Sequence, residues 1–261
     1  MYIERALVAL TALAGIIWAL DALFFARGRV AAAAGGASVK EPITVDYAKS
    51  FLPVLLIVLV IRSFLFEPYR IPSGSMMPTL LTGDFIFVNK FAYGLRLPVI
   101  NTRIVEIGTP ERGDVIVFRL PSDPSVNYVK RVVGLPGDAV EYDPGNKRIT
   151  INGDAVPIDL VGPYDEGPDM VVGYEQLSEH RHRVLFMRGR PPSPGGLYEV
   201  PAGHYFVMGD NRDDSEDGRY LDEVGYIPEG NVVGRATGVW MNWRWPSQGG
   251  PRWNRIGEGI E

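Results

Sequence analysis

The chain of 261 residues contains no cysteine. This absence excludes a thiol nucleophile, disulfide bridges and thiolate metal sites, and it leaves the redox compartment open because a cysteine-free chain tolerates either. Histidine is also scarce, since only His180, His182 and His204 occur. They are too scattered to predict a metal site, and no cofactor is indicated. We expect His180 and His182 on a solvated surface and His204 in a structural role.

Positive charge is not in surplus. Lysine and arginine number 26 against 31 acidic residues, and the formal net charge is -5. Nucleic-acid-binding chains concentrate basic residues on one face, and no basic stripe is visible here. We therefore expect no nucleic-acid partner. The length is sufficient for one or two domains with a substantial core.

Two long apolar runs lie near the start of the chain. The first, Ala6 to Phe25, is interrupted only by Asp21, and at about 1.5 Å per residue its helix would match a hydrocarbon layer of about 30 Å. We predict a first transmembrane helix in residues 1–25. A cleaved signal peptide is the alternative, but no clean small-x-small site follows and a second apolar run comes soon after.

The second apolar run covers residues 51–66, which we predict to be a second transmembrane helix. Its helix would be only about 24 Å long, and it contains Arg62, which we expect to reach toward the membrane interface. A buried helix of a soluble core is the alternative. Residues 55–61 have no polar face to turn toward water, which favours the membrane.

Residues 26–50 join the two runs and carry four basic residues, Arg27, Arg29, Lys40 and Lys49. Only Arg5 precedes the first run, so the positive-inside rule predicts a cytoplasmic linker, with both termini on the outer side. Its stretch 31–37, rich in alanine and glycine, is typical of a flexible, low-complexity segment.

Residues 67–261 have a different pattern, in which short β-rich runs alternate with Gly and Pro. The expected strands cover 85–88, 114–118, 128–133, 148–151, 204–208 and 232–240, separated by turn dipeptides such as Asn152-Gly153. We predict a mainly β domain. Residues 141–200 are expected to contain an inserted smaller β subdomain, because dense Pro, Gly and charge from 154 to 200 interrupt the main pattern.

Ser73 and Ser75 flank Gly74 directly after the second apolar run. In an extended backbone both hydroxyls project to the same side, so one could act as a nucleophile and the other could donate to a developing oxyanion. A serine needs a neighbouring base, and a neutral lysine can serve if burial lowers its pKa. Taken alone, a Ser-Gly-Ser segment is most often merely a loop.

Lys130 is the candidate base, in the β run of residues 128–133. Strand alternation places it on one face with Tyr128 and Val132, while Arg131 points the other way, so Lys130 is the better candidate for a dry environment. The local sequence is equally consistent with an edge lysine whose ammonium reaches solvent.

Five segments together resemble the successive motifs of bacterial type I signal peptidases, in order and in spacing. They are Pro72-Ser-Gly-Ser-Met-Met-Pro-Thr-Leu80, Gly83-Asp84, Arg112-Gly-Asp-Val115, Tyr128-Val-Lys-Arg-Val-Val-Gly-Leu-Pro-Gly-Asp138 and Gly209-Asp-Asn-Arg-Asp-Asp-Ser-Glu-Asp-Gly-Arg219. The likeness extends from the second apolar run to about Trp240. Two anchors and a long insertion are similar to the Gram-negative form of this serine/lysine family.

The resemblance implies roles for the matching positions. Ser75 would attack the scissile carbonyl, Lys130 would be general base and then general acid, and Ser73 with the Ser75 backbone N–H would form the oxyanion hole. Ser215 would orient the lysine ammonium. A supporting ion pair would join Asp217 and Arg219.

The resemblance also implies the substrate and the location. The enzyme would be a multi-pass protein of the cell inner membrane with its catalytic domain on the periplasmic side. It would remove signal peptides from secretory preproteins at Ala-x-Ala sites, with the phospholipid bilayer as second partner. Shallow pockets would take the small side chains, and the apolar candidates are Ile71, Met76, Ile86 and Phe87.

The sequence departs from the family pattern at two points, and two alternative functions remain. The sequence lacks the cysteine pair of the family's inserted subdomain, and it has Gly218 where serine is common. A self-cleaving repressor-type protease uses the same residue pair, but it has no membrane anchors. A non-catalytic, membrane-tethered β domain that binds a partner would leave the combination of Ser75, Lys130 and Ser215 unexplained.

Overall fold

The computed structural model describes residues 2–34, 40–97, 102–165, 167–191, 193–245, 247 and 249–260. The chain divides into two compact units. The first unit comprises Met1–Phe66 and Leu95–Val105, and the second comprises Glu67–Gly94 and Glu106–Glu261.

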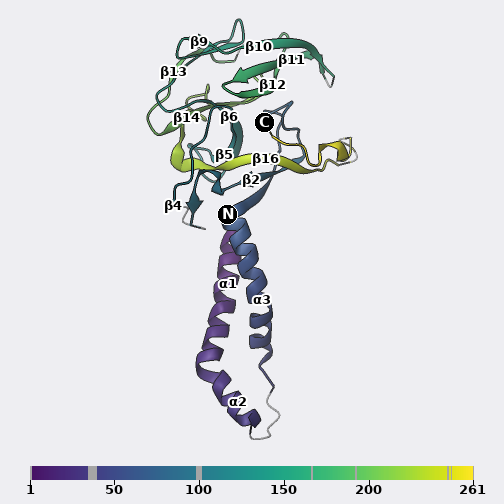
Figure 1. The fold of residues 1–261 in the computed structure, drawn as a ribbon. Helices are drawn as coiled ribbons and strands as arrows, with labels where there is room; N and C mark the ends of the chain where they lie inside the picture. The colour runs from purple at the N-terminus through teal and green to yellow at the C-terminus, as the bar shows by residue number, and fades with distance from the viewer. Residues whose placement is uncertain are drawn as a thin grey trace. The chain divides into compact units, whose positions relative to one another are not determined.

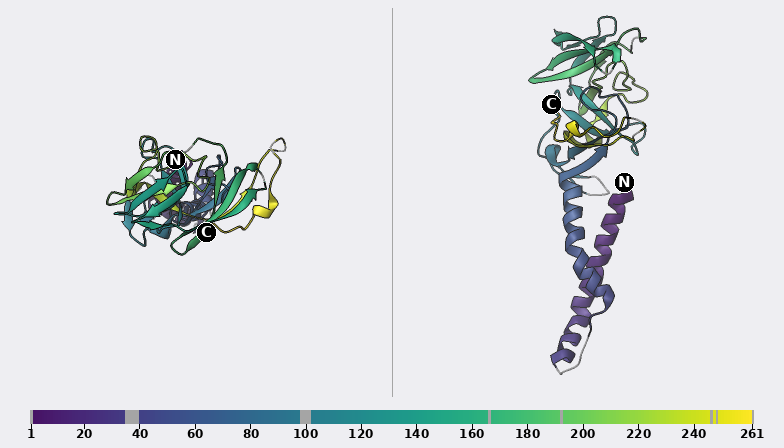
Figure 2. Two further views of the ribbon diagram at one scale, coloured as in Figure 1. Left: turned by 90° about the horizontal axis from the view of Figure 1, so that it is seen from above. Right: turned by 90° about the vertical axis from the view of Figure 1, so that its right-hand side faces the viewer.

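The first unit contains two long helical stretches. One is formed by α1 (Tyr2–Leu20), the π-helical turn η1 (Asp21–Phe25) and α2 (Ala26–Ala34), and the other by α3 (Ile43–Val60) and η2 (Ile61–Leu65). Helices α1 and α3 pack side by side (Figures 1 and 2). The unit also contains a two-stranded sheet of β3 (Leu95–Arg96) and β4 (Arg103–Val105).

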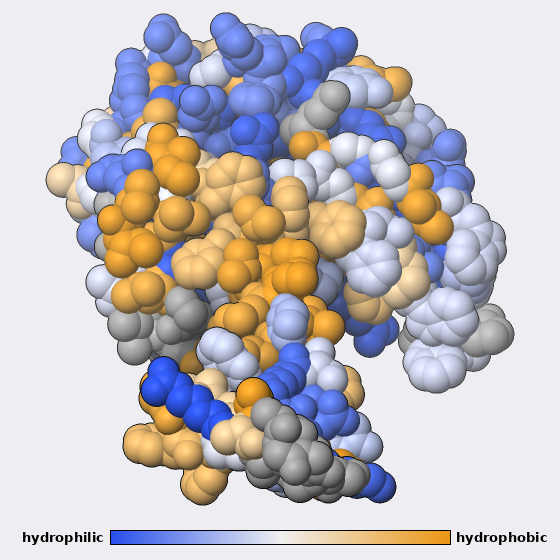
Figure 3. All heavy atoms as spheres, turned by 60° about the horizontal axis from the view of Figure 1, so that its bottom comes forward, coloured by the Kyte–Doolittle hydropathy of each residue, from blue (hydrophilic) through white to orange (hydrophobic). Residues whose placement is uncertain are grey.

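Both helical stretches are long and apolar enough to cross a membrane, over Arg5–Ala31 and Ile43–Leu65. Large apolar side chains point outward from them, as the 71% exposure of Phe24 and the 59% exposure of Ile57 illustrate. Hydrophobic residues are orange in Figure 3. A core helix of a soluble protein would bury such side chains. The finding supports a membrane-anchored protein.

The helices extend beyond the apolar runs. Helix α3 begins at Ile43, eight residues before Phe51, because the polar residues of this segment do not stop a helix and Val45 and Ala48 are buried. Residues 31–34 of the predicted flexible stretch continue α2, as expected for alanine, the best helix former. The rest of that stretch lies outside the described residues.

Asp21, the single charge within the first apolar run, is buried and paired. Its carboxylate accepts hydrogen bonds from the Arg29 guanidinium at 2.5 Å. Charged groups in apolar helices are tolerated when they are paired in this way.

A seven-stranded sheet forms the base of the second unit, in the order β1-β2-β16-β5-β6-β14-β15. The sheet is curled (Figure 1). Its strands are β1 (Phe66–Arg70), β2 (Asp84–Asn89), β5 (Val115–Arg119), β6 (Asn127–Gly134), β14 (His204–Met208), β15 (Ile227–Pro228) and β16 (Val232–Asn242). The short 3-10 turns are η3 (Phe91–Tyr93), η4 (Glu229–Asn231) and η6 (Trp253–Arg255).

Two smaller sheets are built between β6 and β14. One has the order β13-β7-β8-β9 and the other the order β10-β11-β12. Their strands are β7 (Ala139–Asp143), β8 (Arg148–Ile151), β9 (Asp154–Ala155), β10 (Ile158–Tyr164), β11 (Gly167–Leu177), β12 (His180–Met187) and β13 (Gly196–Glu199). The predicted fold class, mainly β with an inserted smaller β part, is confirmed.

Asn152 and Gly153 form the two-residue turn between β8 and β9. Both have positive φ, 53° and 90°, as a type I′ hairpin turn requires. The Asn-Gly signal in the sequence therefore identified a real hairpin.

Candidate active site

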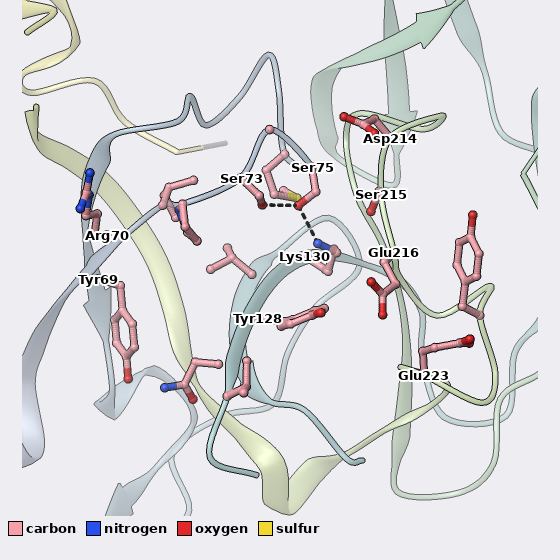
Figure 4. Close-up of a pocket in the computed structure, with 18 of the residues that line it drawn as sticks. Tyr69, Arg70, Ser73, Ser75, Tyr128, Lys130, Asp214, Ser215, Glu216 and Glu223 are labelled. Atoms are coloured by element: carbon pink, nitrogen blue, oxygen red, sulfur yellow. Dashed lines mark hydrogen bonds between the residues drawn. The ribbon is translucent and has the colours of Figure 1, made fainter. Parts of the chain in front are cut away.

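Ser75 and Lys130 meet although 55 positions separate them. Ser75 lies in the turn after β1, and Lys130 lies on β6. The Lys130 Nζ is 2.7 Å from the Ser75 Oγ (Figure 4). This is the contact expected between a serine nucleophile and its base.

Burial changes the acid–base behaviour of Lys130. Lys130 is buried, with an exposure of 4%. This burial lowers the pKa of Lys130 to about 8, against the opposing effect of the carboxylates of Asp217, Glu216 and Asp210. The amine can therefore lose its proton at a mildly alkaline pH and accept another from Ser75.

The backbone around Ser75 is held by Asn211. The Asn211 N–H donates to the Ser75 carbonyl at 3.1 Å, and its side-chain amide donates to the Gly74 carbonyl at 3.1 Å. Gly209 allows this close approach, because a Cβ there would lie 2.5 Å from the Ser75 carbonyl oxygen. Sequence reasoning did not assign a role to Asn211, since nothing in a charged loop indicates which carbonyls it will contact.

Ser73 lies beside Ser75. Its Oγ is 3.4 Å from the Ser75 Oγ, and its side chain is exposed. The Ser75 backbone N–H donates to no other described residue. A hydroxyl and an N–H are thus both available to an oxyanion formed at Ser75.

Ser215 lines the same cavity as Lys130. Its hydroxyl is buried, and the pKa of Asp217 is lowered in part by its interaction with Ser215. The structure records no direct hydrogen bond from Ser215 to Lys130, so the predicted orienting role remains a prediction.

Asp217 and Arg219 form a fully buried ion pair, with Nε to Oδ1 at 2.8 Å. Burial by itself raises the pKa of Asp217, but Arg219 outweighs it and holds this pKa below its ordinary value. Asp217 also accepts the Gly209 N–H at 2.9 Å. The pair therefore fixes the loop that carries Asn211 and Ser215.

A second buried ion pair, Arg131 with Asp210, was not predicted. The guanidinium donates twice to the carboxylate, each time at 2.8 Å, and Thr79 donates to Asp210 at 2.5 Å. The prediction that Lys130 is drier than Arg131 is wrong, because Arg131 has an exposure of 0%. Lys130 and Arg131 are both buried because the two faces of β6 are both covered at this point. Alternation in the sequence separates side chains into two faces but does not show which face is exposed.

His182 corrects a further expectation. It was predicted on a solvated surface, yet its exposure is 4%. On β12 it lies 3.3 Å from Glu175 and 3.9 Å from Asp210. Burial, together with the positive charge of Arg131, lowers the pKa of His182. The arginines on either side of His182 suggested a solvated surface. Because successive side chains of a strand point to opposite faces, His182 can be buried although its neighbours are not.

The serine and lysine open into a cavity of about 810 Å³. Of the four apolar candidates for substrate pockets, Ile71 and Met76 line it. Ile71 and Met76 are also buried in the core cluster that contains Ile86. Ile86 and the exposed Phe87 do not line the cavity. Alternation along β2 places Ile86 and Phe87 on opposite faces of the strand, so the two residues could not both face one pocket.

Two strand edges border the cavity. β1 is the terminal strand of its sheet. On β6, residues 127–130 pair with β5, while β14 joins only from Arg131 onward. Tyr69 and Arg70 come from the first edge and residues 127–130 from the second. An extended peptide can therefore hydrogen-bond in this groove as an added strand.

Among the residues that the structure describes, no group of three or more His, Asp or Glu side chains could hold a metal ion. A serine hydroxyl in contact with a buried amine, with further hydrogen-bond donors beside it, is the arrangement that a serine hydrolase requires.

Comparisons with known proteins identify the class. The family model described as signal peptidase, peptidase S26, matches residues 44–243. A signal peptidase I of Pseudomonas fluorescens is 49% identical over 275 residues, covering 96% of each chain. That of Pseudomonas aeruginosa is 52% identical over 229 residues, covering 84% of this chain and 80% of its own. A crystal structure of a signal peptidase I from Enterococcus faecalis is 26% identical and covers 50% of this chain and 98% of that one, with a TM-score of 0.30.

The chain belongs to the S26 family of signal peptidases. The predicted resemblance to bacterial type I signal peptidases is thereby confirmed, as is the prediction of a serine peptidase.

Proposed function

We propose that the chain removes signal peptides from secretory preproteins, with Ser75 as the nucleophile and Lys130 as its base. The 2.7 Å contact between Nζ and Oγ carries this assignment. The lowered pKa of Lys130, about 8, supports it because a base must spend part of its time without a proton.

In the first half of the reaction, the Ser75 Oγ attacks the scissile carbonyl carbon while its proton passes to the Lys130 Nζ. The resulting oxyanion accepts hydrogen bonds from the Ser73 hydroxyl and the Ser75 N–H. The carbon–nitrogen bond then breaks, and the Lys130 ammonium donates its proton to the leaving amine. The acyl group stays on Ser75.

In the second half, Lys130 takes a proton from water as the water oxygen attacks the acyl carbon. Collapse of this intermediate releases the signal peptide and returns a proton to Ser75. Ser215 orients the ammonium at both proton transfers, and the Asp217–Arg219 pair keeps its loop in place.

The peptide before the cut would lie between β1 and residues 127–130. Ile71 and Met76, which line the cavity, are suited to contact small side chains of an Ala-x-Ala site. Main-chain hydrogen bonds supply affinity in this arrangement, and the pockets supply selectivity.

The two apolar helices would anchor the enzyme in the cell inner membrane, with the catalytic domain on the periplasmic side. The basic residues between the helices support this orientation. A precursor with its apolar segment in the same bilayer meets the enzyme at a raised effective concentration.

The test is cleavage of a precursor with an Ala-x-Ala site by the detergent-solubilised protein. Wild type should cleave it, and Ser75→Ala and Lys130→Ala should abolish cleavage while remaining folded. Retained cleavage by Ser75→Ala would reject the nucleophile. Absence of cleavage by folded wild type would favour a β domain that only binds, and preferential cleavage of its own chain would favour a repressor-type protease.

A further inference from the structure

A second cavity, of about 430 Å³, lies in the inserted β part of the domain. Its walls are apolar and come from β10, β11 and β12. They include Ile158, Leu160, Val171, Phe186 and Met187. Leu160 is 67% exposed. An apolar hollow with a few polar groups at its rim is the usual form of a ligand-binding site.

The rim of this cavity is basic. Four cationic side chains line it, Lys147, Arg148, Arg188 and Arg190. Two are neutralised by carboxylates, since Lys147 pairs with Asp213 and Arg190 pairs with Asp214 at 2.8 Å. Arg148 and Arg188 have no carboxylate partner within the described parts of the chain. Two positive charges are therefore left for an anionic ligand.

The second cavity adjoins the catalytic cavity. Arg190 lines both. Asp213 lines the catalytic cavity, and it accepts the Met187 N–H at 2.7 Å as well as the Lys147 ammonium. A peptide that leaves the catalytic cavity past Arg190 would therefore reach the second cavity directly.

The direction of the substrate is set by the strand edges. If the peptide before the cut lies between β1 and β6, the chain after the cut must leave on the other side of Ser75. Figure 4 shows Tyr69 and Arg70 on one side of the Ser75–Lys130 pair and Asp214 and Ser215 on the other. Arg190 is paired with Asp214 on that second side.

We infer that the second cavity binds the mature segment of the preprotein, downstream of the cut, and favours an acidic residue next to an apolar one. This inference rests on the proposed function. The acidic residue would pair with Arg148 and Arg188, and the apolar residue would cover Phe186 and Leu160.

The preference should depend on position. Glu216 and Glu223 line the catalytic cavity, and we expect their negative charge to disfavour an acidic residue immediately after the cut. An acidic–apolar pair is therefore expected to help only farther along. It should act within roughly the first ten mature residues, which span about 33 Å when extended.

The experiment uses full-length, detergent-solubilised enzyme and precursors with one signal peptide. An Asp-Leu or a Lys-Leu pair is moved stepwise through the early mature segment, and kcat/KM is measured for each. At the best position wild type should prefer Asp-Leu by about fivefold, as expected for two partly exposed ion pairs. The preference should shrink at high salt.

The double variant Arg148→Glu/Arg188→Glu should reverse the preference while cleaving a neutral precursor normally. The matched control is Arg181→Glu, which alters an exposed arginine on β12 that pairs with Asp159 rather than lining the cavity. It should leave the preference unchanged.

Ser75-dependent cleavage with equal rates for Asp-Leu and Lys-Leu at every position would overturn the inference and leave the proposed function intact. The same effect in Arg181→Glu as in the double variant Arg148→Glu/Arg188→Glu would reduce the preference to general electrostatics and also overturn the inference. Absence of any Ser75-dependent cleavage would instead reject the proposed function.

Discussion

Lys130 is a buried amine, and in the proposed mechanism its neutral form is the reactive one. Because burial lowers its pKa to about 8, we expect kcat/KM to rise with pH through an apparent midpoint near that value. The measurement is a pH profile from about pH 6 to 10, with protein integrity checked at each end. A flat profile, or a midpoint close to the ordinary lysine pKa, would contradict a lysine base with this environment.

The same lysine should reduce stability. A native pKa below the unfolded one means that the folded chain binds the proton less tightly, so stability is diminished below about pH 8 and recovers as the pH rises toward 10.5. The lowering of the Lys130 pKa corresponds to a loss of about 3 kcal/mol in the free energy of unfolding. We expect Lys130→Met to raise the free energy of unfolding at pH 7 by up to this amount, measured by urea denaturation. The stability gained by Lys130→Met should vanish near pH 10.5. An equal gain at that pH would show that the buried charge of Lys130 is not its cause.

Ser73 offers a test of the oxyanion site. Ser73→Ala removes one donor near Ser75, and loss of one such donor lowers kcat by roughly 10²- to 10³-fold. Steady-state kinetics with a fixed precursor measure the effect, and Ser73→Thr, which keeps a hydroxyl, is the control. An unchanged kcat in Ser73→Ala would remove this residue from the site.

Among the structural elements, β11 is joined by an ion pair to the loop that carries Asn211 and Ser215. Glu175 on β11 accepts hydrogen bonds from both terminal nitrogens of Arg212, and both side chains are buried. Burial by itself raises the pKa of Glu175, but Arg212 outweighs it and holds that pKa well below its usual range. The inserted β part thus supports the loop that presents Asn211 and Ser215.

Breaking this pair should therefore be costly. We expect Glu175→Gln to lower the free energy of unfolding by about 3–5 kcal/mol, because the Arg212 charge stays buried without its partner. Chemical denaturation of the detergent-solubilised protein measures the loss. Glu199→Gln, at an exposed position of β13, is the matched control and should be neutral. Equal stabilities of the two variants would show that the pair does not hold the loop.

The sequence located six of the sixteen described strands, and most of the supporting ion pairs were not predicted. The β-rich runs and turn dipeptides located β2, β5, β6, β8, β14 and β16, because alternation and turn chemistry are local properties. The pairing of Arg131 with Asp210 joins residues 79 positions apart. No local pattern specifies such a contact. Local reasoning made Ser73, Ser75 and Lys130 candidates, and only the family resemblance assigned Ser75 as nucleophile and Lys130 as its base.

At the scale of the whole molecule, the absence of cysteine makes the membrane orientation measurable. Lys40→Cys places one thiol between the two helices, and Leu197→Cys places one on the exposed face of β13. With the connector in the cytoplasm and the catalytic domain outside, a membrane-impermeant maleimide should label Leu197→Cys on intact inner membranes. Lys40→Cys should react only after the membrane is opened.

Wild type provides the blank, since it has no thiol to label. The reverse pattern would place the catalytic domain in the cytoplasm, where Ser75 could not meet precursors emerging on the outer side. Labelling of both variants on sealed membranes would mean that the two helices do not separate the connector from the β domain. Only the expected pattern agrees with an enzyme that meets its substrate through a shared bilayer, because the scissile bond and Ser75 must lie on the same side.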